Sequence, residues 1–207
     1  MRILILLIGK IFLRDEIHST KTAVAQIIHS KNYLIAQNEL LLSALIAGED
    51  RRYLKHAGYD PIAITRAIRN KIFQNRTEGA STIEQQLTRT ITGRYERTAA
   101  RKIKEIIISC ALSTAFKKQE IAYCYISTAY YGWSMNNIQQ AYTRLKLNNS
   151  SLTQLQAAKL IARLRYPEPQ KPQKIRKQKI LSRARYIMDL QKNHSFKECL
   201  RINNATI

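Results

Sequence analysis

Apolar residues recur every three or four positions along most of the chain, which is the spacing of one face of an α-helix. The pattern extends over residues 39–48, 60–74, 81–91, 98–117, 118–130, 136–146, 152–165 and 175–191. The sequence contains no sustained alternation of apolar and polar residues and no Asn-Gly turn. The pattern therefore predicts an all-α, or nearly all-α, protein.

Segment 60–74 shows how the sequence marks the start of a helix. Asp60 is suited to cap a helix N-terminus, and Pro61 is suited to its first turn. A stripe of apolar residues follows at helical spacing: Ile62, Ile64, Ala67, Ile68 and Ile72. Because Arg66, Arg69 and Lys71 lie off this stripe, the segment predicts an amphipathic helix.

The N-terminus carries an apolar run at residues 3–8, which resumes at 11–13 after Gly9 and Lys10. A helix over these residues spans about 16 Å, whereas a membrane-spanning helix needs roughly 20 apolar residues. We therefore expect no ordinary transmembrane helix here. The run fits a short signal-like segment, an interfacial anchor or a buried helix, and a membrane-associated role is favoured.

Polar stretches at 75–80 and 92–96 separate helical segments, and a Pro-rich stretch at 166–172 cannot continue a helix. We expect three parts along the chain. They are a short apolar anchor with its lead-in at 1–37, one main domain at 38–172, and a basic helical tail at 173–207.

Charge narrows the choice of partner. The 207 residues include 35 Lys and Arg against 14 Asp and Glu, a formal net charge of +21. This excess points to nucleic acid, an anionic membrane surface or a phosphate-bearing substrate. The scattered Cys110, Cys124 and Cys199 exclude a disulfide scaffold and a zinc ribbon, and the four histidines form no metal-binding spacing with them.

A first candidate for chemistry is the Glu-Asp-Arg-Arg-Tyr sequence at 49–53, which follows an apolar helix. Glu49 comes four residues after Leu45 and shares its face, so its carboxylate is partly removed from water, which suits a general base. Asp50 faces elsewhere. The simpler interpretation is a solvated helix end with local ion pairs.

A second candidate lies at residues 78–86, where small residues lead into Ser81 and Thr82 at a helix start. Glu84 follows Ser81 by three residues, which is the spacing of a capping box. The N–H groups of such a helix start also form an anion site. Capping is the simpler interpretation.

A third candidate is Glu105, which stands among a dense set of cations: Arg89, Arg94, Arg97, Arg101, Lys102 and Lys104. Guanidinium groups bind phosphate through paired hydrogen bonds. A carboxylate in this setting is expected to stay ionised, to orient the cations or to help hold a divalent ion. A surface ion pair with Arg101, four residues earlier, is the simpler interpretation.

Aromatic residues gather in one region: Tyr123, Tyr125, Tyr130, Tyr131 and Trp133. Such clusters suit sugar faces or membrane interfaces, and ordinary helix packing explains them equally well.

The order and spacing of five motifs is more specific than any one of them. They are EDRRY (49–53), EGASTIEQQ (78–86), RKIKE (101–105), YISTAYYG (125–132) and LTQLQAAKLIARLRYP (152–167). Together they resemble the peptidoglycan glycosyltransferases of family 51, the transglycosylase domain of class A penicillin-binding proteins and of monofunctional transglycosylases. The resemblance covers about residues 38–172. It implies a lysozyme-like, mainly α-helical fold with two lobes.

The resemblance implies polymerisation of lipid II into β-1,4-linked glycan strands. Glu49 matches the general base. Glu105 matches a second acid that supports the diphosphate directly or through a divalent cation such as Mg²⁺ or Mn²⁺, and no organic cofactor is implied. The predicted residues of the diphosphate site and cleft are Asp50, Arg51, Ser81, Thr82, Gln85, Gln86, Arg89, Arg97, Arg101 and Lys102.

The chain departs from the family pattern at a few positions. Ala80 replaces a Gly, Glu84 stands where Thr is usual, Arg89 replaces Lys and Ser127 replaces Asn, while residues 133–136 read WSMN instead of a Gly-rich stretch. These departures bear on substrate preference and rate, and they motivate an alternative, a degenerate module that binds lipid II or the membrane without turnover.

A second alternative is a lysozyme-like muramidase, against which the RKIKE and EGASTIEQQ motifs argue. Nucleic-acid binding is disfavoured, because the basic residues lie within motifs that a diphosphate lipid already explains. The expected location is the bacterial cytoplasmic membrane, with the catalytic domain on its periplasmic face. The expected partners are lipid II, the nascent glycan strand, the anionic membrane surface and other cell-wall or envelope-assembly proteins.

Overall fold

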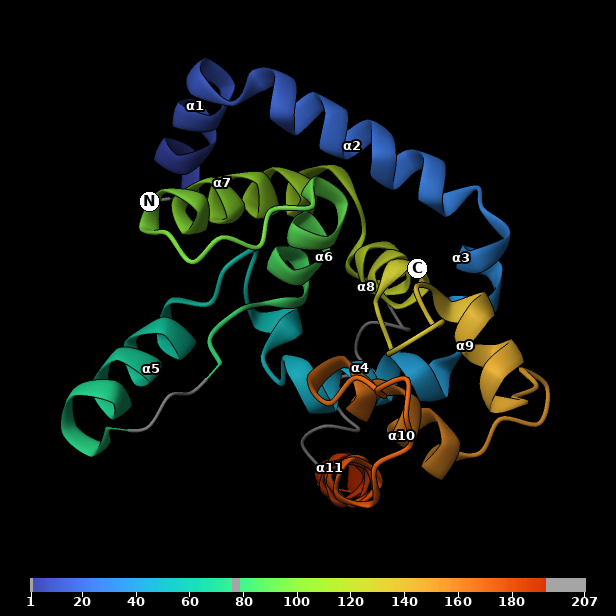
Figure 1. Ribbon diagram of the computed structural model, residues 1–207. Helices are drawn as coiled ribbons and strands as arrows, with labels where there is room; N and C mark the ends of the chain where they lie inside the picture. Colours follow the sequence, from blue (N-terminus) through green and yellow to red (C-terminus); the bar gives the residue numbers. More distant parts are fainter. Residues whose placement is uncertain (1, 76–78, 193–207) are drawn as a thin grey trace. The chain divides into compact units, whose positions relative to one another are not determined.

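The computed structural model describes residues 2–75 and 79–192, and this part of the chain is built from helices (Figure 1). The α-helices are α1 (Arg2–Phe12), α2 (Arg14–Ile28), α3 (Lys31–Ala36), α4 (Glu39–Glu49), α5 (Pro61–Gln74), α6 (Ile83–Thr92), α7 (Ala99–Ala115), α8 (Lys118–Thr128), α9 (Ile138–Leu145), α10 (Gln154–Arg165) and α11 (Lys174–Lys192). A 3₁₀ turn, η1 (Tyr53–Lys55), follows α4. Among the described residues there is no β-strand, only isolated bridges from Gly132 to Met135 and Glu168. The all-α prediction is confirmed.

Helix starts follow the capping chemistry of the sequence. Asp60 caps α5 by accepting a hydrogen bond from the Ile62 N–H at 3.0 Å, and Pro61 is the first residue of the helix, as predicted. At α10 the side chains of Thr153 and Gln156 form a complete capping box. Because each cap satisfies N–H groups that have no partner within the helix, these positions fix where the helices begin.

The capping box expected from Ser81 and Glu84 is wrong by one residue. Thr82 caps α6, and its Oγ1 accepts a hydrogen bond from the Gln85 N–H at 3.3 Å. The Glu84 carboxylate instead pairs with Lys118. A tertiary ion pair therefore overrides the local hydrogen bond that the sequence spacing suggested.

Two helices lie where the sequence analysis identified none, over residues 14–36. Helix α2 starts with the acidic residues Asp15 and Glu16 in its first turn, which is favourable at a helix N-terminus. Ser30 caps α3 by accepting a hydrogen bond from the Tyr33 N–H at 3.2 Å. These signals are short and polar, and a pattern of apolar residues does not include them.

The chain divides into two compact units, and each is described by itself. Within the described residues, unit 1 comprises 2–26 and 52–121, and unit 2 comprises 27–51 and 122–192. In unit 1, helix α7 packs on α1 and α6. In unit 2, helices α4, α10 and α11 pack on one another. The presence of two units agrees with the two lobes that the resemblance implied.

The core of unit 2 forms around α4, which is apolar along nearly its whole length. Leu41 and Leu45 of α4 and Leu160 of α10 are fully buried. Helix α11, from the basic tail, contributes the buried Ile180 and Ile187. The apolar residues of this cationic helix therefore hold it against α4 and α10.

Two helices of unit 1 expose apolar faces. On α1 the exposed residues are Ile3, Leu4, Leu7, Ile11 and Phe12. On α5 they are Ile62, Ile68, Ile72 and Phe73. Among the described helices, none combines the length and apolar character that a bilayer crossing requires.

Candidate functional site

In unit 1, Glu105 is held by three cationic side chains, which with it form the Glu105 cluster: Arg89, Arg101, Lys102 and Glu105. The Lys102 Nζ donates to Glu105 Oε1 at 2.7 Å. Arg89 donates from Nε to Oε2 at 3.2 Å and from Nη2 to Oε1 at 3.3 Å. Arg101 Nη1 donates to Oε2. The Glu105 side chain is only 3% exposed, so these cations replace the water it has lost.

Helix geometry gathers this cluster. Arg101, Lys102 and Glu105 lie within little more than one turn of α7, so the three side chains share one face. Arg89 comes from α6, which is tied to α7 by a buried contact of 3.1 Å between the hydroxyls of Thr88 and Ser109. The surface ion pair considered for Arg101 and Glu105 is thus a pair with a buried carboxylate.

The predicted polar residues at the start of α6 extend the cluster. Lys102 Nζ also donates to Ser81 Oγ at 3.0 Å and to Gln85 Oε1 at 2.6 Å. Arg89 Nη2 lies 3.4 Å from Ser81 Oγ. Ser81 and Gln85, both predicted as cleft residues, therefore join the cations that surround Glu105, and their part in substrate binding stays a prediction.

Thr82 has a different environment from Ser81. Its side chain is buried, caps α6 and donates to the Gly58 carbonyl at 2.8 Å. Gln86 is half-buried on α6, and Arg97 lies exposed in the segment before α7. Glu78, the first residue of the EGASTIEQQ motif, lies outside the described residues, as does Cys199.

The electrostatics of the cluster keep its acid ionised. Burial alone would raise the pKa of Glu105, but the hydrogen bonds and charges of Arg89 and Lys102 outweigh it and lower that pKa below its usual value. Burial lowers the pKa of Lys102, assisted by the charges of Arg89 and Arg101 and opposed by Glu105. The lowered pKa agrees with the expectation that Glu105 stays ionised. Three cations around one anion leave an excess of two positive charges, which suits a diphosphate.

The same contacts decide whether Glu105 is a suitable metal ligand. Both of its carboxylate oxygens already accept hydrogen bonds from cationic side chains. A divalent ion would have to displace those cations and would meet their repulsion. The donor set around Glu105 does not fit a divalent cation.

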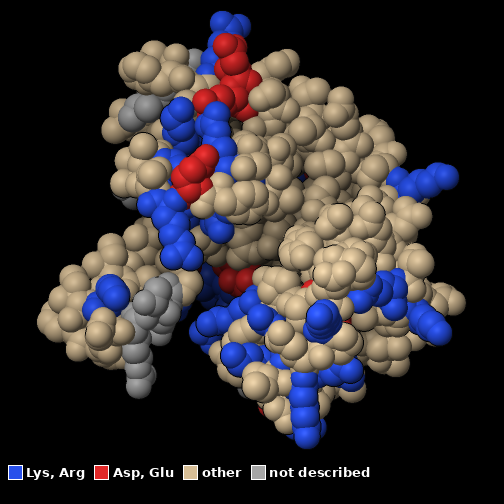
Figure 2. Space-filling view, viewed as in Figure 1, with Lys and Arg blue, Asp and Glu red and all other residues tan. Residues whose placement is uncertain are grey.

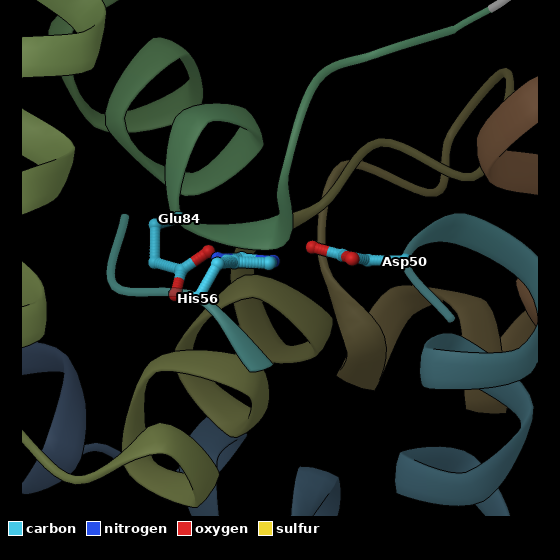
Figure 3. A group of neighbouring side chains, drawn as sticks. All are labelled: Asp50, His56 and Glu84. Atoms are coloured by element: carbon cyan, nitrogen blue, oxygen red, sulfur yellow. The ribbon is translucent and has the colours of Figure 1, made fainter. Parts of the chain in front are cut away.

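Glu84 is a second buried acid of unit 1. It is fully buried, pairs with Lys118 and accepts a hydrogen bond from Ser113 Oγ at 3.1 Å. Figure 3 shows the Glu84 carboxylate and the His56 ring pointing toward each other, and their nearest ligand atoms lie within 4.8 Å. The negative charge that distinguishes this chain at position 84 is therefore paired within unit 1. Asp50, also labelled in Figure 3, belongs to unit 2.

In unit 2, Glu49 is the last residue of α4, and its side chain is 14% exposed. Arg183 of α11 lies beside it, with 3.5 Å between Arg183 Nη2 and Glu49 Oε1. The same Nη2 donates to the carbonyl of Gly48. The sequence analysis missed Arg183, because a basic residue in a basic tail carries no signal of its partner.

The two predicted residues after Glu49 differ in burial. Asp50 forms the C-cap of α4, is 8% exposed and donates its N–H to the Ile46 carbonyl at 3.1 Å. Arg51 is exposed. In unit 1, the next residue, Arg52, pairs with the α5 cap Asp60 at 2.8 Å.

Arg183 also lines a surface hollow of about 510 Å³ between the end of α10 and α11. Its lining is cationic and aromatic: Arg165, Tyr166, Ile175, Gln178, Lys179, Ser182, Arg183 and Tyr186. On the face drawn in Figure 2, Lys and Arg side chains are numerous where α10 and α11 lie in Figure 1.

The aromatic cluster of the sequence separates into core and surface residues. Tyr131 is fully buried, its hydroxyl donates to the Ile126 carbonyl at 2.6 Å, and burial raises its pKa well above the usual value. Tyr123 and Tyr125 are also buried. Trp133 is exposed, with the Arg144 guanidinium 5.1 Å from its ring centre. Core packing therefore explains most of the cluster.

Comparison with known proteins agrees with this arrangement. A family model described as "Transglycosylase" matches residues 16–192. Penicillin-binding protein 1A of Vibrio cholerae is 37% identical over 119 residues, which is 56% of this chain and 14% of that protein. The monofunctional glycosyltransferase of Staphylococcus haemolyticus is 31% identical over 149 residues, or 67% of this chain and 55% of that protein. Penicillin-binding protein 1A of Escherichia coli is 39% identical over 94 residues, or 45% of this chain and 11% of that protein.

The chain thus spans about half of the monofunctional relative and a small part of the two penicillin-binding proteins. The family match includes α4 with Glu49, α6 and α7 with the Glu105 cluster, and α11 with Arg183. This chain belongs to the transglycosylase family, glycosyltransferase family 51.

Proposed function

We propose that this chain is a peptidoglycan glycosyltransferase that polymerises lipid II into β-1,4-linked glycan strands. Its membership of the transglycosylase family supports this activity, as does the relative named "Monofunctional glycosyltransferase". The observation that carries the proposal is the Glu105 cluster, a buried carboxylate that fixes three cations in place.

This cluster supplies what the departure of a lipid diphosphate requires. Negative charge grows on the diphosphate oxygens as the bond to the sugar breaks, and positive groups that are already in place stabilise that charge most. Arg89 and Lys102 are fixed by Glu105 and also contact Ser81, so they need little rearrangement. Glu105 thereby acts as a positioning residue for the cations.

Glu49 is the proposed general base. It accepts the proton from the 4-hydroxyl of the acceptor sugar, and the oxygen of that hydroxyl attacks the anomeric carbon of the donor. The bond from that carbon to the diphosphate oxygen breaks as the new glycosidic bond forms, with inversion at the anomeric carbon. A sugar hydroxyl is a weak nucleophile at neutral pH, so a carboxylate placed to take its proton is needed.

Because the donor set around Glu105 does not fit the divalent cation expected there, the proposed reaction includes no step through that ion. Three side chains already supply positive charge at that carboxylate. If the ion assists turnover, the proposal places it with the substrate diphosphate and not on Glu105.

The proposal places the chain at the outer face of the bacterial cytoplasmic membrane. The exposed apolar faces of α1 and α5 suit contact with a bilayer, and the net charge of +21 suits anionic lipids. A lipid-linked substrate would meet the protein at such a surface.

The test is polymerisation of fluorescent lipid II by the purified protein, with glycan strands resolved by gel electrophoresis. The wild type should produce strands, and Glu49→Gln should not, although it folds. Arg51→Gln changes the charge of an exposed residue close to Glu49 in the sequence, and its rate is compared with that of Glu49→Gln. Lipid II bound without strand formation would point to a module without turnover, and soluble fragments released from cell-wall sacculi would point to a muramidase.

A further inference from the structure

The proposed general base occupies a position that a helix alone holds poorly. Glu49 is the last residue of α4, and the final carbonyl groups of a helix have no partner within it. Helix ends also fray, so a side chain at such an end needs support from another element. A proton acceptor with a variable position would lose rate steeply, since misplacement by about 1 Å costs roughly a hundredfold.

Arg183 supplies that support from α11. Its Nη2 donates a hydrogen bond to the carbonyl of Gly48, within the last turn of α4. The same atom lies 3.5 Å from Glu49 Oε1. One guanidinium group therefore contacts both the backbone and the acid at the end of α4. With side chains only 15% and 14% exposed, Arg183 and Glu49 are shielded from most of the screening by water.

The helix that carries Arg183 is itself well anchored on α4. Ile187, one turn further along α11, is fully buried against Gly48, where a Cβ would come within 3.0 Å of it. Gln191 donates to Ser43 Oγ of α4 at 2.7 Å and accepts from Gln154 of α10 at 3.1 Å. These contacts fix the register of α11 along α4.

The Arg183 side chain also contacts an aromatic ring of its own helix. The Arg183 guanidinium carbon lies 5.3 Å from the centre of the Tyr186 ring, within the range of a cation–π contact. Its approach to Glu49 is therefore set before any substrate binds.

We propose that Arg183 is a positioning residue that orients Glu49 for proton transfer. This inference rests on the proposed function, in which Glu49 is the base. Arg183 itself neither gives nor takes a proton. It fixes the direction of the carboxylate, so that the chemical step depends on Arg183 more than substrate binding does.

The test compares three variants in the lipid II assay: Arg183→Met, Arg183→Lys and Arg185→Met. Arg183→Met keeps an unbranched apolar stem but removes the charge and the hydrogen bonds, and we expect kcat to fall roughly 10- to 100-fold while KM stays within about threefold. Arg183→Lys retains a cation and should recover part of kcat. Arg185→Met removes an equal charge from an exposed position of the same helix and should leave kcat unchanged.

The inference is overturned if Arg183→Met and Arg185→Met have equal kcat, or if Arg183→Met raises KM alone. A second measurement does not depend on activity. Unfolding in urea of Glu49→Gln, Arg183→Met and the double variant should be non-additive if the two side chains interact, and additive effects would contradict the contact. A wild type that makes no glycan would defeat the proposed function, whereas this unfolding cycle would still test the pair.

Discussion

The two acids that the proposed reaction uses lie in very different surroundings. Glu105 of unit 1 lies within α7, is almost fully buried and accepts hydrogen bonds from three cations. Glu49 of unit 2 ends α4, is more exposed and lies 3.5 Å from one arginine. Both are glutamates on helices, so their different roles come from these neighbours and not from residue type.

The difference teaches how one residue type serves two purposes. A carboxylate held by several cations is committed to its charge and cannot exchange protons usefully near neutral pH. A carboxylate at the end of a helix that is less buried, as Glu49 is, is the better candidate of the two to take a proton from a substrate hydroxyl. Charge fixation is the proposed role of Glu105, and proton transfer is the proposed role of Glu49.

The largest effect should come from Glu49→Gln, which removes the proton acceptor but keeps the shape of the side chain. We expect strand formation to fall by about a thousandfold, in line with the range for general bases. The free energy of unfolding should change by less than about 1 kcal/mol, since the acid is partly exposed and its ion pair is long. Initial rates and urea unfolding measure the two quantities. If Glu49→Gln kept more than a tenth of the wild-type rate, the contrast between the two acids would be lost.

Lys118→Met sharpens the comparison with a third acid, because it leaves the fully buried Glu84 carboxylate without its cation. Breaking a buried ion pair from one side costs about 3 kcal/mol, so this variant should be strongly destabilised. The double variant Lys118→Met with Glu84→Gln should recover much of the loss, because the buried charge is then gone. Thermal and urea unfolding of the wild type and the two variants measure these changes, and equal stability of the single and double variants would contradict a buried ion pair.

Two glycines near the two sites should respond unequally to alanine. At Gly58, φ is +92° and a Cβ would lie 2.6 Å from the backbone of Ser109 and Cys110, so Gly58→Ala should destabilise by about 2–3 kcal/mol. At Gly48 the nearest atom is the flexible end of Ile187, at 3.0 Å, so Gly48→Ala should cost about 1 kcal/mol or less. Urea unfolding measures the stability of both variants. If Gly48→Ala were the more destabilised, the Ile187 side chain could not move to make room for the added methyl group.

The smallest effect is the acid response of the Glu105 cluster. Since the pKa of Glu105 is lower in the folded chain, its ion pairs stabilise the fold above the ordinary carboxyl pKa of 4.5, and this contribution disappears as the pH falls below that value. Glu105→Gln should therefore be less stable by about 1–2 kcal/mol at pH 7, with a smaller gap near pH 3.

Burial would raise the pKa values of Glu16 and Asp60, but both are lowered, that of Glu16 by Arg94 and Lys104 and that of Asp60 by the backbone N–H of Ala63 and by Arg52. Both carboxylates are present in the wild type and in Glu105→Gln, so their acid response cancels in the difference. Urea unfolding at several pH values measures the gap. If the difference in unfolding free energy between the wild type and Glu105→Gln stayed constant from pH 7 to pH 3, Glu105 would not be the source of the lost stability in acid.

Prediction from sequence succeeded where the signal was local. The Asp60–Pro61 start of α5 and the i, i+4 relation of Arg101 and Glu105 follow from helix geometry alone, and both are confirmed. The all-α class followed from the same periodicity. The density of basic residues placed Arg89 with Glu105, and the family motifs added Ser81 and Gln85 as cleft residues; the structure brings all three to the Glu105 cluster.

Prediction failed where a distant residue decides the outcome. Glu84 pairs with Lys118 and does not cap α6, and no sequence pattern around position 84 indicates this partner. Arg183 reaches the end of α4 from 135 positions away in the sequence. Helices α2 and α3 were missed although their starts carry local signals, acidic residues in the first turn of α2 and the Ser30 cap of α3.

The interleaving of the two units has a consequence for how the protein is made. Neither unit is a continuous stretch of chain, because residues 52–121 of unit 1 interrupt unit 2, and residues 2–26 precede both of its parts. The ribosome therefore synthesises α4, which carries Glu49, long before α11, which carries Arg183. During synthesis, the apolar surface of α4 is covered only when α10 and then α11 emerge, so it stays exposed while more than a hundred residues are added.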